Sequence, residues 1–155
     1  HTSERVWHLC FPRGARVRPQ LCMAVALANN SSDRPLAAAA ATAVEFLHCA
    51  SLVHDDLPCF DDATERRGKP SVHAKFGERI AVLTGDALIV AAFQTLAVHA
   101  IHNVRAERVP LVLSILARGV GAPHGIAAGQ AWECAGALDL QSRLLTDRSL
   151  VLKGF

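Results

Sequence analysis

Two long segments of the chain are almost free of charge, and they limit the possible folds more than any other feature. Residues 36–57 are rich in alanine and carry one glutamate and two histidines before a pair of aspartates, and residues 80–102 have Asp86 and Gln94 as their polar exceptions. A helix that is apolar on most sides is expected to be buried on most sides. We therefore predict two core helices, and no membrane span, because charged or amide side chains interrupt both segments.

Weaker helical patterns surround these two segments. Alanine and leucine dominate the 155 residues, aromatic residues make up only 5%, and tyrosine is absent, a balance that favours helices over strands. No segment has the pattern of a convincing strand. The sequence thus predicts an all-α helical bundle that forms one compact domain or part of a larger one, with further helices over 19–29, 109–120, 125–140 and 138–152 and loops over 29–35, 58–77 and 119–124.

Charge and cysteine content exclude several classes of function. The net charge of +2 is too small, and the basic residues too scattered, to predict a nucleic-acid partner. The five cysteines are an odd number at irregular spacings, and none forms a C-x-x-C pair, so neither a zinc site nor a disulfide framework is indicated. Reduced thiols are typical of a cytoplasmic protein, which is the location we predict.

A cluster of acids follows the first apolar segment. Asp55 and Asp56 come at the predicted C-terminal end of that helix, where the helix dipole disfavours negative charge. Asp61 would point away from Asp55 on a straight helix, so the interruption at Pro58 must redirect it. Clustered carboxylates without cysteine ligands suit Mg²⁺, which often binds substrate phosphates as well. The alternative is a solvated loop that is rich in aspartate.

Two groups of arginines and one glycine-containing helix accompany the acids. Arg66 and Arg67 are adjacent and therefore point in different directions, so they could bind two separate anions. Exposed ion pairs with neighbouring acids are the alternative. The segment 13–19 places three arginines before a helix start, where anions bind readily. In 125–133, two glycines four residues apart precede Gln130, a pattern that equally suits close helix packing.

Together these motifs resemble the polyprenyl synthetase family, the trans-isoprenyl diphosphate synthases. Asp55-Asp56-Leu57-Pro58-Cys59-Phe60-Asp61 is similar to the first Asp-rich motif of that family in its DDx₄D form, and Arg66-Arg67-Gly68-Lys69-Pro70 continues it. Other similar segments are Gly85-Asp86-Ala87-Leu88, Arg16-Val17-Arg18-Pro19 and Gly129-Gln130. The match covers nearly the whole chain and is greatest with geranylgeranyl and farnesyl diphosphate synthases.

The resemblance implies a fold, a reaction and a set of residue roles. It implies antiparallel helices around a central cavity, in a homodimer or in a heterodimer with a related synthase. The reaction would join isopentenyl diphosphate to an allylic diphosphate with the help of Mg²⁺. By the resemblance, Asp55, Asp56 and Asp61 would hold the metal and Arg66 would touch the allylic diphosphate. The residues implied for isopentenyl diphosphate are Arg18, His48 and Arg67, and Gln130 would lie near the reacting carbons or the metal.

Product length and completeness are two further expectations from the resemblance. Ala50 and Ser51 precede the first Asp pair where bulk limits the product in this family, and neither is aromatic, which favours a C20 product over C15; the alternative is that they only pack the helix. Ala15 replaces the lysine of the family's GGKRxRP motif, and Arg13 or Arg16 could substitute for it. These 155 residues hold no second DDxxD motif, so we expect residues 1–155 to be the N-terminal part of one synthase domain. A non-catalytic partner subunit of such a synthase is the alternative.

Overall fold

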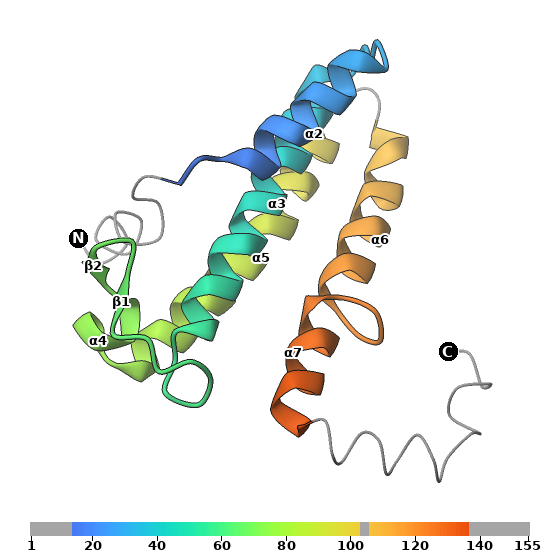
Figure 1. The fold of residues 1–155 in the computed structure, drawn as a ribbon. Helices are drawn as coiled ribbons and strands as arrows, with labels where there is room; N and C mark the ends of the chain where they lie inside the picture. The colour runs from blue at the N-terminus through green and yellow to red at the C-terminus, as the bar shows by residue number, and fades with distance from the viewer. Residues whose placement is uncertain (1–13, 103–105, 137–155) are drawn as a thin grey trace, which may run out of the picture. The chain divides into compact units, whose positions relative to one another are not determined.

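The computed structural model describes residues 14–102 and 106–136 (Figure 1). The chain divides into two compact units, His1–Leu113 and Ser114–Phe155. The elements, in chain order, are α2 (Val17–Ala28), α3 (Arg34–Asp55), β1 (Glu65–Arg66), β2 (Lys69–Pro70), α4 (Val72–Phe76), α5 (Glu78–His102), the 3₁₀ helix η1 (Ala106–Arg108), α6 (Val109–Val120) and α7 (Ile126–Ala135). The class is all-α, as the composition predicts.

The first unit is built on α3 and α5. These helices lie side by side and run in opposite directions, and α2 lies along α3 (Figure 1). Small side chains such as Ala50 and Ala81, each at most 2% exposed, let the two helix backbones approach closely. The buried core cluster between α3, α4 and α5 consists of Cys49, Ala50, Val53, Leu57, Val72, Ala81 and Leu88.

The ends of α3 determine where its polar residues lie. Asp33 caps the N-terminus, because its carboxylate accepts a 3.1 Å hydrogen bond from the backbone N–H of Leu36, and Pro35 occupies the first turn, where its missing N–H costs nothing. The helix ends at Asp55, with Asp56 as the C-cap. The predicted helix over 36–57 is therefore correct to within two residues at each end, and the two acids do lie at its C-terminus.

The loop predicted over 58–77 contains regular structure that the sequence analysis missed. Glu65 pairs with Pro70 and Arg66 with Lys69 in a two-stranded antiparallel hairpin, and α4 follows it directly. Strands of two residues are too short for an alternating pattern to be visible in the sequence. The helix predicted over 125–140 is also too long, because α7 ends at Ala135 and Gly136 follows it with a positive φ of 72°. The helix predicted over 138–152 lies outside the described residues.

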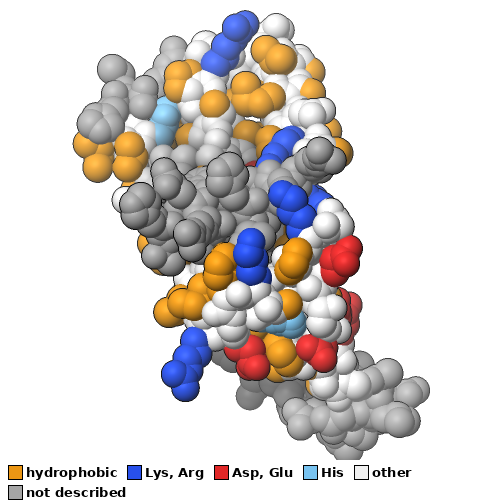
Figure 2. Space-filling model, turned by 90° about the vertical axis from the view of Figure 1, so that its left-hand side faces the viewer, with side chains coloured by type: hydrophobic (Ala, Val, Ile, Leu, Met, Phe, Trp, Pro, Cys, Tyr) orange, Lys and Arg blue, Asp and Glu red, His pale blue; other side chains and the backbone are white. Residues whose placement is uncertain are grey.

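The prediction that α5 is buried on most sides is wrong. One face packs on α3 and α4, but Leu83 and Val90, among others, are more than 60% exposed. Hydrophobic side chains also lie at the surface across the face drawn in Figure 2. By length and composition, α3 and α5 are both able to cross a membrane. A core helix of a soluble protein meets the same criteria, so the absence of a membrane span stays a prediction.

Candidate active site

The turn after α3 brings Asp61 back to Asp55. The N–H of Asp61 donates to the carbonyl oxygen of Asp55 over 3.0 Å, while the carbonyl of Leu57 accepts from the N–H groups of Phe60 and Asp62. Pro58, which cannot continue the helix, lies at the start of this turn. The side chains of Asp55 and Asp61 are also close enough to interact. The prediction that the interruption at Pro58 redirects the later acid is therefore confirmed.

Asp55 is held in an environment that disfavours its negative charge. Its pKa is raised, first by partial burial and then by the negative charge of Asp61, with a smaller effect from Asp56, and Arg66 only partly offsets this. The carboxylate also lies at the C-terminal end of α3, where the helix dipole adds to the cost. A further cation placed between Asp55 and Asp61 would relieve this repulsion.

Arg66 is paired with Asp56. Its Nε lies 2.8 Å and 3.0 Å from the two carboxylate oxygens of Asp56, and its Nη2 lies 2.6 Å from Oδ1. The same Nη2 is 3.6 Å from Oδ2 of Asp55. The Asp56 side chain is only 4% exposed, so the arginine compensates a carboxylate that water hardly reaches. Exposed ion pairs of the arginines with Asp61, Asp62 or Glu65 were the alternative, and the observed partner of Arg66 is none of these.

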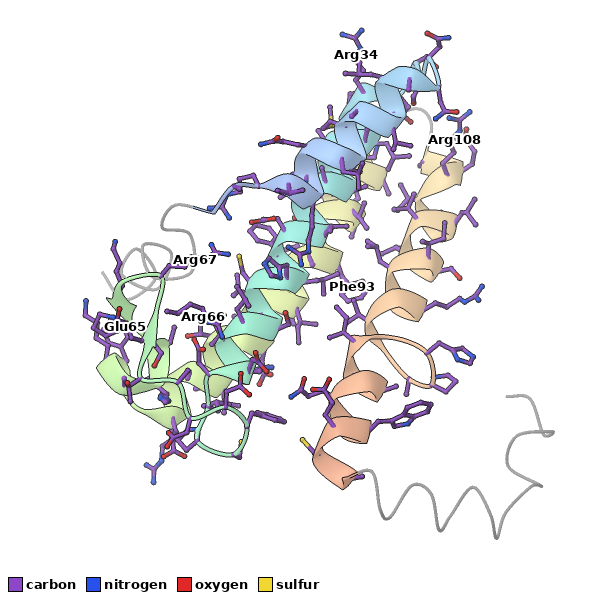
Figure 3. All side chains as sticks on the ribbon, in the orientation of Figure 1. Arg34, Glu65, Arg66, Arg67, Phe93 and Arg108 are labelled. Carbon is purple, nitrogen blue, oxygen red and sulfur yellow. The ribbon has the colours of Figure 1, made fainter. Side chains whose placement is uncertain are left out.

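The hairpin turn separates Arg66 from Arg67. Arg67 and Gly68, the two central residues, both have positive φ angles of 55° and 76°, as tight two-residue hairpin turns require. Figure 3 shows both arginines on the hairpin beside α3. A Cβ atom built on Gly14 would lie 2.8 Å from Nη1 of Arg67, so this guanidinium reaches the segment before α2. The prediction that the adjacent arginines point in different directions is thus confirmed, and their binding of two anions stays a prediction.

A second basic cluster surrounds His48 on α3. Burial and the charge of Arg18 lower the pKa of His48, and Arg67 and Arg66 lower it further, whereas Glu45 acts in the opposite direction. These arginines come from α2 and from the hairpin, so the fold brings three separate segments of sequence to one place. The structure thus brings together Arg18, His48 and Arg67, the three residues implied for isopentenyl diphosphate.

Glu45 is a member of this cluster that the sequence analysis missed. Its side chain is 11% exposed and forms an ion pair with Arg16, the residue that precedes α2. Arg16 has a left-handed backbone with φ of 50°, which orients the start of α2 toward α3. The available signal was that Glu45 is the only acid inside an otherwise uncharged segment. Arg16, proposed as a substitute for the missing lysine, is engaged by Glu45, and Arg13 lies outside the described residues.

The remaining predicted residues are more dispersed. Ala50 is 2% exposed and belongs to the core cluster, while the hydroxyl of Ser51 donates to the carbonyl of His48 over 2.8 Å. Gln130 is partly buried on α7, which belongs to the second unit. Gly125 forms the tight turn before α7, where a Cβ would lie 2.4 Å from the carbonyl oxygen of Gly121, whereas Gly129 has no described atom within 4 Å of such a Cβ.

The carboxylates fit Mg²⁺ better than a metal held entirely by protein. Across residues 14–102 and 106–136, no three His, Cys, Asp or Glu side chains converge as a complete metal-binding set. Mg²⁺ is usually held by one or two carboxylates and completes its shell with water and substrate phosphates. The facing pair Asp55 and Asp61 matches that demand, because both ligands are carboxylate oxygens, and burial together with the charge of Asp61 raises the pKa of Asp55.

Fold and site together define a class of protein: an all-α bundle that holds a carboxylate cluster and two arginine groups at one end of an apolar helix. The chain belongs to the polyprenyl synthetase family, whose family model matches residues 1–147. It is 50% identical over 131 residues to a geranylgeranyl diphosphate synthase of Cereibacter sphaeroides and 48% identical over 130 residues to that of Rhodobacter capsulatus. Each match covers 84% of this chain but only 45% and 44% of the relative, so the chain spans less than half the length of these relatives.

Solved structures show the same fold. A FPP/GFPP synthase from Zymomonas mobilis superposes with a TM-score of 0.77 at 38% identity, covering 85% of this chain and 46% of the other. A geranyltransferase from Legionella pneumophila gives a TM-score of 0.78 at 30% identity, covering 93% of this chain and 52% of the other. The antiparallel helical fold expected from the sequence motifs is therefore the fold of these synthases.

Proposed function

We propose that the chain forms part of a prenyltransferase that joins isopentenyl diphosphate to an allylic diphosphate, and that its product is geranylgeranyl diphosphate. One observation carries the proposal: a basic cluster around His48 and a carboxylate cluster with Arg66 lie along the same side of α3. His48 and Asp55 are seven residues apart, which returns the helix to nearly the same direction about 10 Å further along its axis. Arg18 and Arg67 lie at the first position and Arg66 at the second.

We propose a different task for each member of the acid cluster. Asp55 and Asp61 would hold Mg²⁺, which supplies positive charge to the diphosphate that leaves the allylic carbon. Asp56 would orient Arg66, because its buried carboxylate contacts that guanidinium through three close atom pairs. Arg66 presents its remaining N–H groups to the same diphosphate and stabilises the charge that develops as it departs.

The second site would bind isopentenyl diphosphate. Arg18 and Arg67 provide charge from two segments, and after burial their charges contribute to the lowered pKa of His48. Holding both substrates on one helix lets the double bond of the second approach the allylic carbon of the first. By family resemblance we also propose that Gln130 lies near the reacting carbons or the metal, and that the protein is a homodimer or a heterodimer with a related synthase. A cytoplasmic location, suggested by the cysteine content, is part of the proposal as well.

A C20 product is the finer part of the proposal. The two bacterial relatives are named geranylgeranyl diphosphate synthases. Ala50 and Ser51 offer no aromatic bulk before the acid pair, although Ala50 itself packs in the core cluster. Replacing Ser51 with Phe is expected to shorten the product if the position faces the growing chain.

The test is incubation of the chain with Mg²⁺, isopentenyl diphosphate and a C10 or C15 allylic diphosphate, with product length read by chromatography. Turnover supports catalysis by this chain. Lack of turnover combined with tight association with a full-length synthase would instead support the partner-subunit alternative. Calorimetry of Mg²⁺-dependent diphosphate binding tests the site itself, and the absence of any such binding would overturn the proposal.

A further inference from the structure

The imidazole ring of His54 lies directly on the backbone of α5 at Gly85. A Cβ atom built on Gly85 would lie 2.0 Å from Nε2, 2.4 Å from Cδ2 and 2.6 Å from Cε1 of His54. All three distances are far below van der Waals contact. Glycine is therefore the one residue that leaves room for the ring at this place, and even alanine would displace it.

A glycine in the interior of a long helix needs a reason, because it is less favourable there than alanine. Gly85 is buried in the middle of α5 and has no positive φ that would demand glycine. The reason is the ring of His54. The contact with His54 of α3 thus explains why position 85, just before Asp86, is a glycine.

A hydrogen bond fixes the ring in this notch. Nε2 of His54 lies 3.2 Å from the carbonyl oxygen of Val82, and since a carbonyl can only accept, Nε2 carries the proton. The same Nε2 is 3.6 Å from Oδ1 of Asp86, which favours that tautomer. Three residues on one turn of α5, Val82, Gly85 and Asp86, therefore lie against the ring of His54.

His54 immediately precedes the two acids. Its carbonyl oxygen accepts a 3.0 Å hydrogen bond from the N–H of Leu57, which closes the last turn of α3. This hydrogen bond joins the backbone of His54 to the turn that carries Asp55 and Asp56. We infer that the His54–Gly85 contact is a positioning device that sets the last turn of α3 and, through it, the direction of the Asp55 carboxylate. The metal-related part of this inference rests on the proposed function.

The first arm of the test is a double-mutant cycle on urea unfolding. Gly85→Ala adds helix propensity but expels His54, so it should stabilise the protein more in the His54→Ala background than in the native one. Gly119→Ala is the matched control, because Gly119 is a helical glycine with no described atom within 4 Å of a built Cβ, and its effect should not depend on His54. If Gly85→Ala changes the free energy of unfolding equally in both backgrounds, residues 54 and 85 are not coupled and the inference is overturned.

The second arm measures what the contact does for the site. Gly85→Ala should raise the Mg²⁺ concentration needed for half-maximal binding of inorganic diphosphate about tenfold, the lower end of the cost of losing a supporting residue at a metal site. With Gly85 intact, His54→Gln can still donate a hydrogen bond to Val82, so its Mg²⁺ requirement should stay close to the native value. His54→Ala cannot make this hydrogen bond, and its Mg²⁺ requirement should rise. A coupled cycle with an unchanged Mg²⁺ requirement would overturn the positioning role.

Hydrogen exchange separates failure of this inference from failure of the proposed function. The amides of Asp56 and Leu57 should exchange faster in Gly85→Ala and in His54→Ala than in the native chain, because both variants lose the contact. If the native chain shows no Mg²⁺-dependent binding, the proposed function fails, and exchange then decides the positioning alone. Unchanged exchange at both amides would overturn it.

Discussion

Arg66→Ala is the substitution whose effect on stability follows most directly from the structure. Arg66 meets the Asp56 carboxylate through Nε at 2.8 Å and 3.0 Å and through Nη2 at 2.6 Å. Its removal leaves behind a carboxylate whose side chain is 4% exposed. The ion pair also ties the hairpin to the end of α3, so the loss affects both segments.

The size of the effect depends on how far water can replace the arginine. Removing one partner of a fully buried ion pair costs about 3–5 kcal/mol. The Arg66 side chain is 32% exposed, so water would enter the vacated space and restore part of the solvation. We therefore expect a loss of about 2 kcal/mol in the free energy of unfolding, or roughly 4–8 °C in Tm for a domain of this size.

The assay is urea unfolding followed by far-ultraviolet circular dichroism. Arg79→Ala is the control, since Arg79 is an exposed arginine on α5, and its removal should change stability by less than about 0.5 kcal/mol. The double variant Arg66→Ala with Asp56→Asn should recover part of the loss, because no buried charge then remains unpaired. If Arg66→Ala lowers the free energy of unfolding no more than Arg79→Ala does, the stabilising role of the Arg66–Asp56 pair is refuted.

Three further predictions concern the two anion sites. Asp55→Asn should weaken Mg²⁺-dependent diphosphate binding about tenfold, roughly 1.4 kcal/mol, in calorimetry, whereas Asp62→Asn in the exposed part of the same turn should leave it nearly unchanged. Burial and then the charge of Arg18 lower the pKa of His48, and the negative charge of a bound diphosphate should raise that pKa, so that His48 takes up a proton on binding. Affinity should therefore increase as the pH falls from about 8 to about 6, and a His48→Gln variant that kept the full pH dependence would contradict this. Glu45→Gln and Arg16→Gln should show a coupling of about 1–2 kcal/mol in unfolding, since both remove the same ion pair, and additive effects would exclude it.

Much of the fold could be predicted because its causes are local. The alanine-rich, nearly uncharged segments predict α3 and α5 to within two residues at each end. The pattern over 109–120 predicts both ends of α6 correctly. These predictions succeed because helix propensity and apolar periodicity act over one or two turns of chain. The motifs around Asp55 and Arg66 were sufficient to predict the family, which the family model confirms. The hairpin was missed because two-residue strands leave no periodic signal.

The pairing of the polar residues was decided by the tertiary structure. The sequence determined by itself that carboxylates, guanidiniums and apolar helices would occur together, and which ions they would suit. Only the tertiary structure decided that Arg66 forms an ion pair with Asp56, that Arg16 forms one with Glu45 and that the ring of His54 packs on Gly85. The physical reason is that partner choice depends on distances between segments far apart in sequence, and those distances are set by the turns and close helix contacts that local composition does not specify.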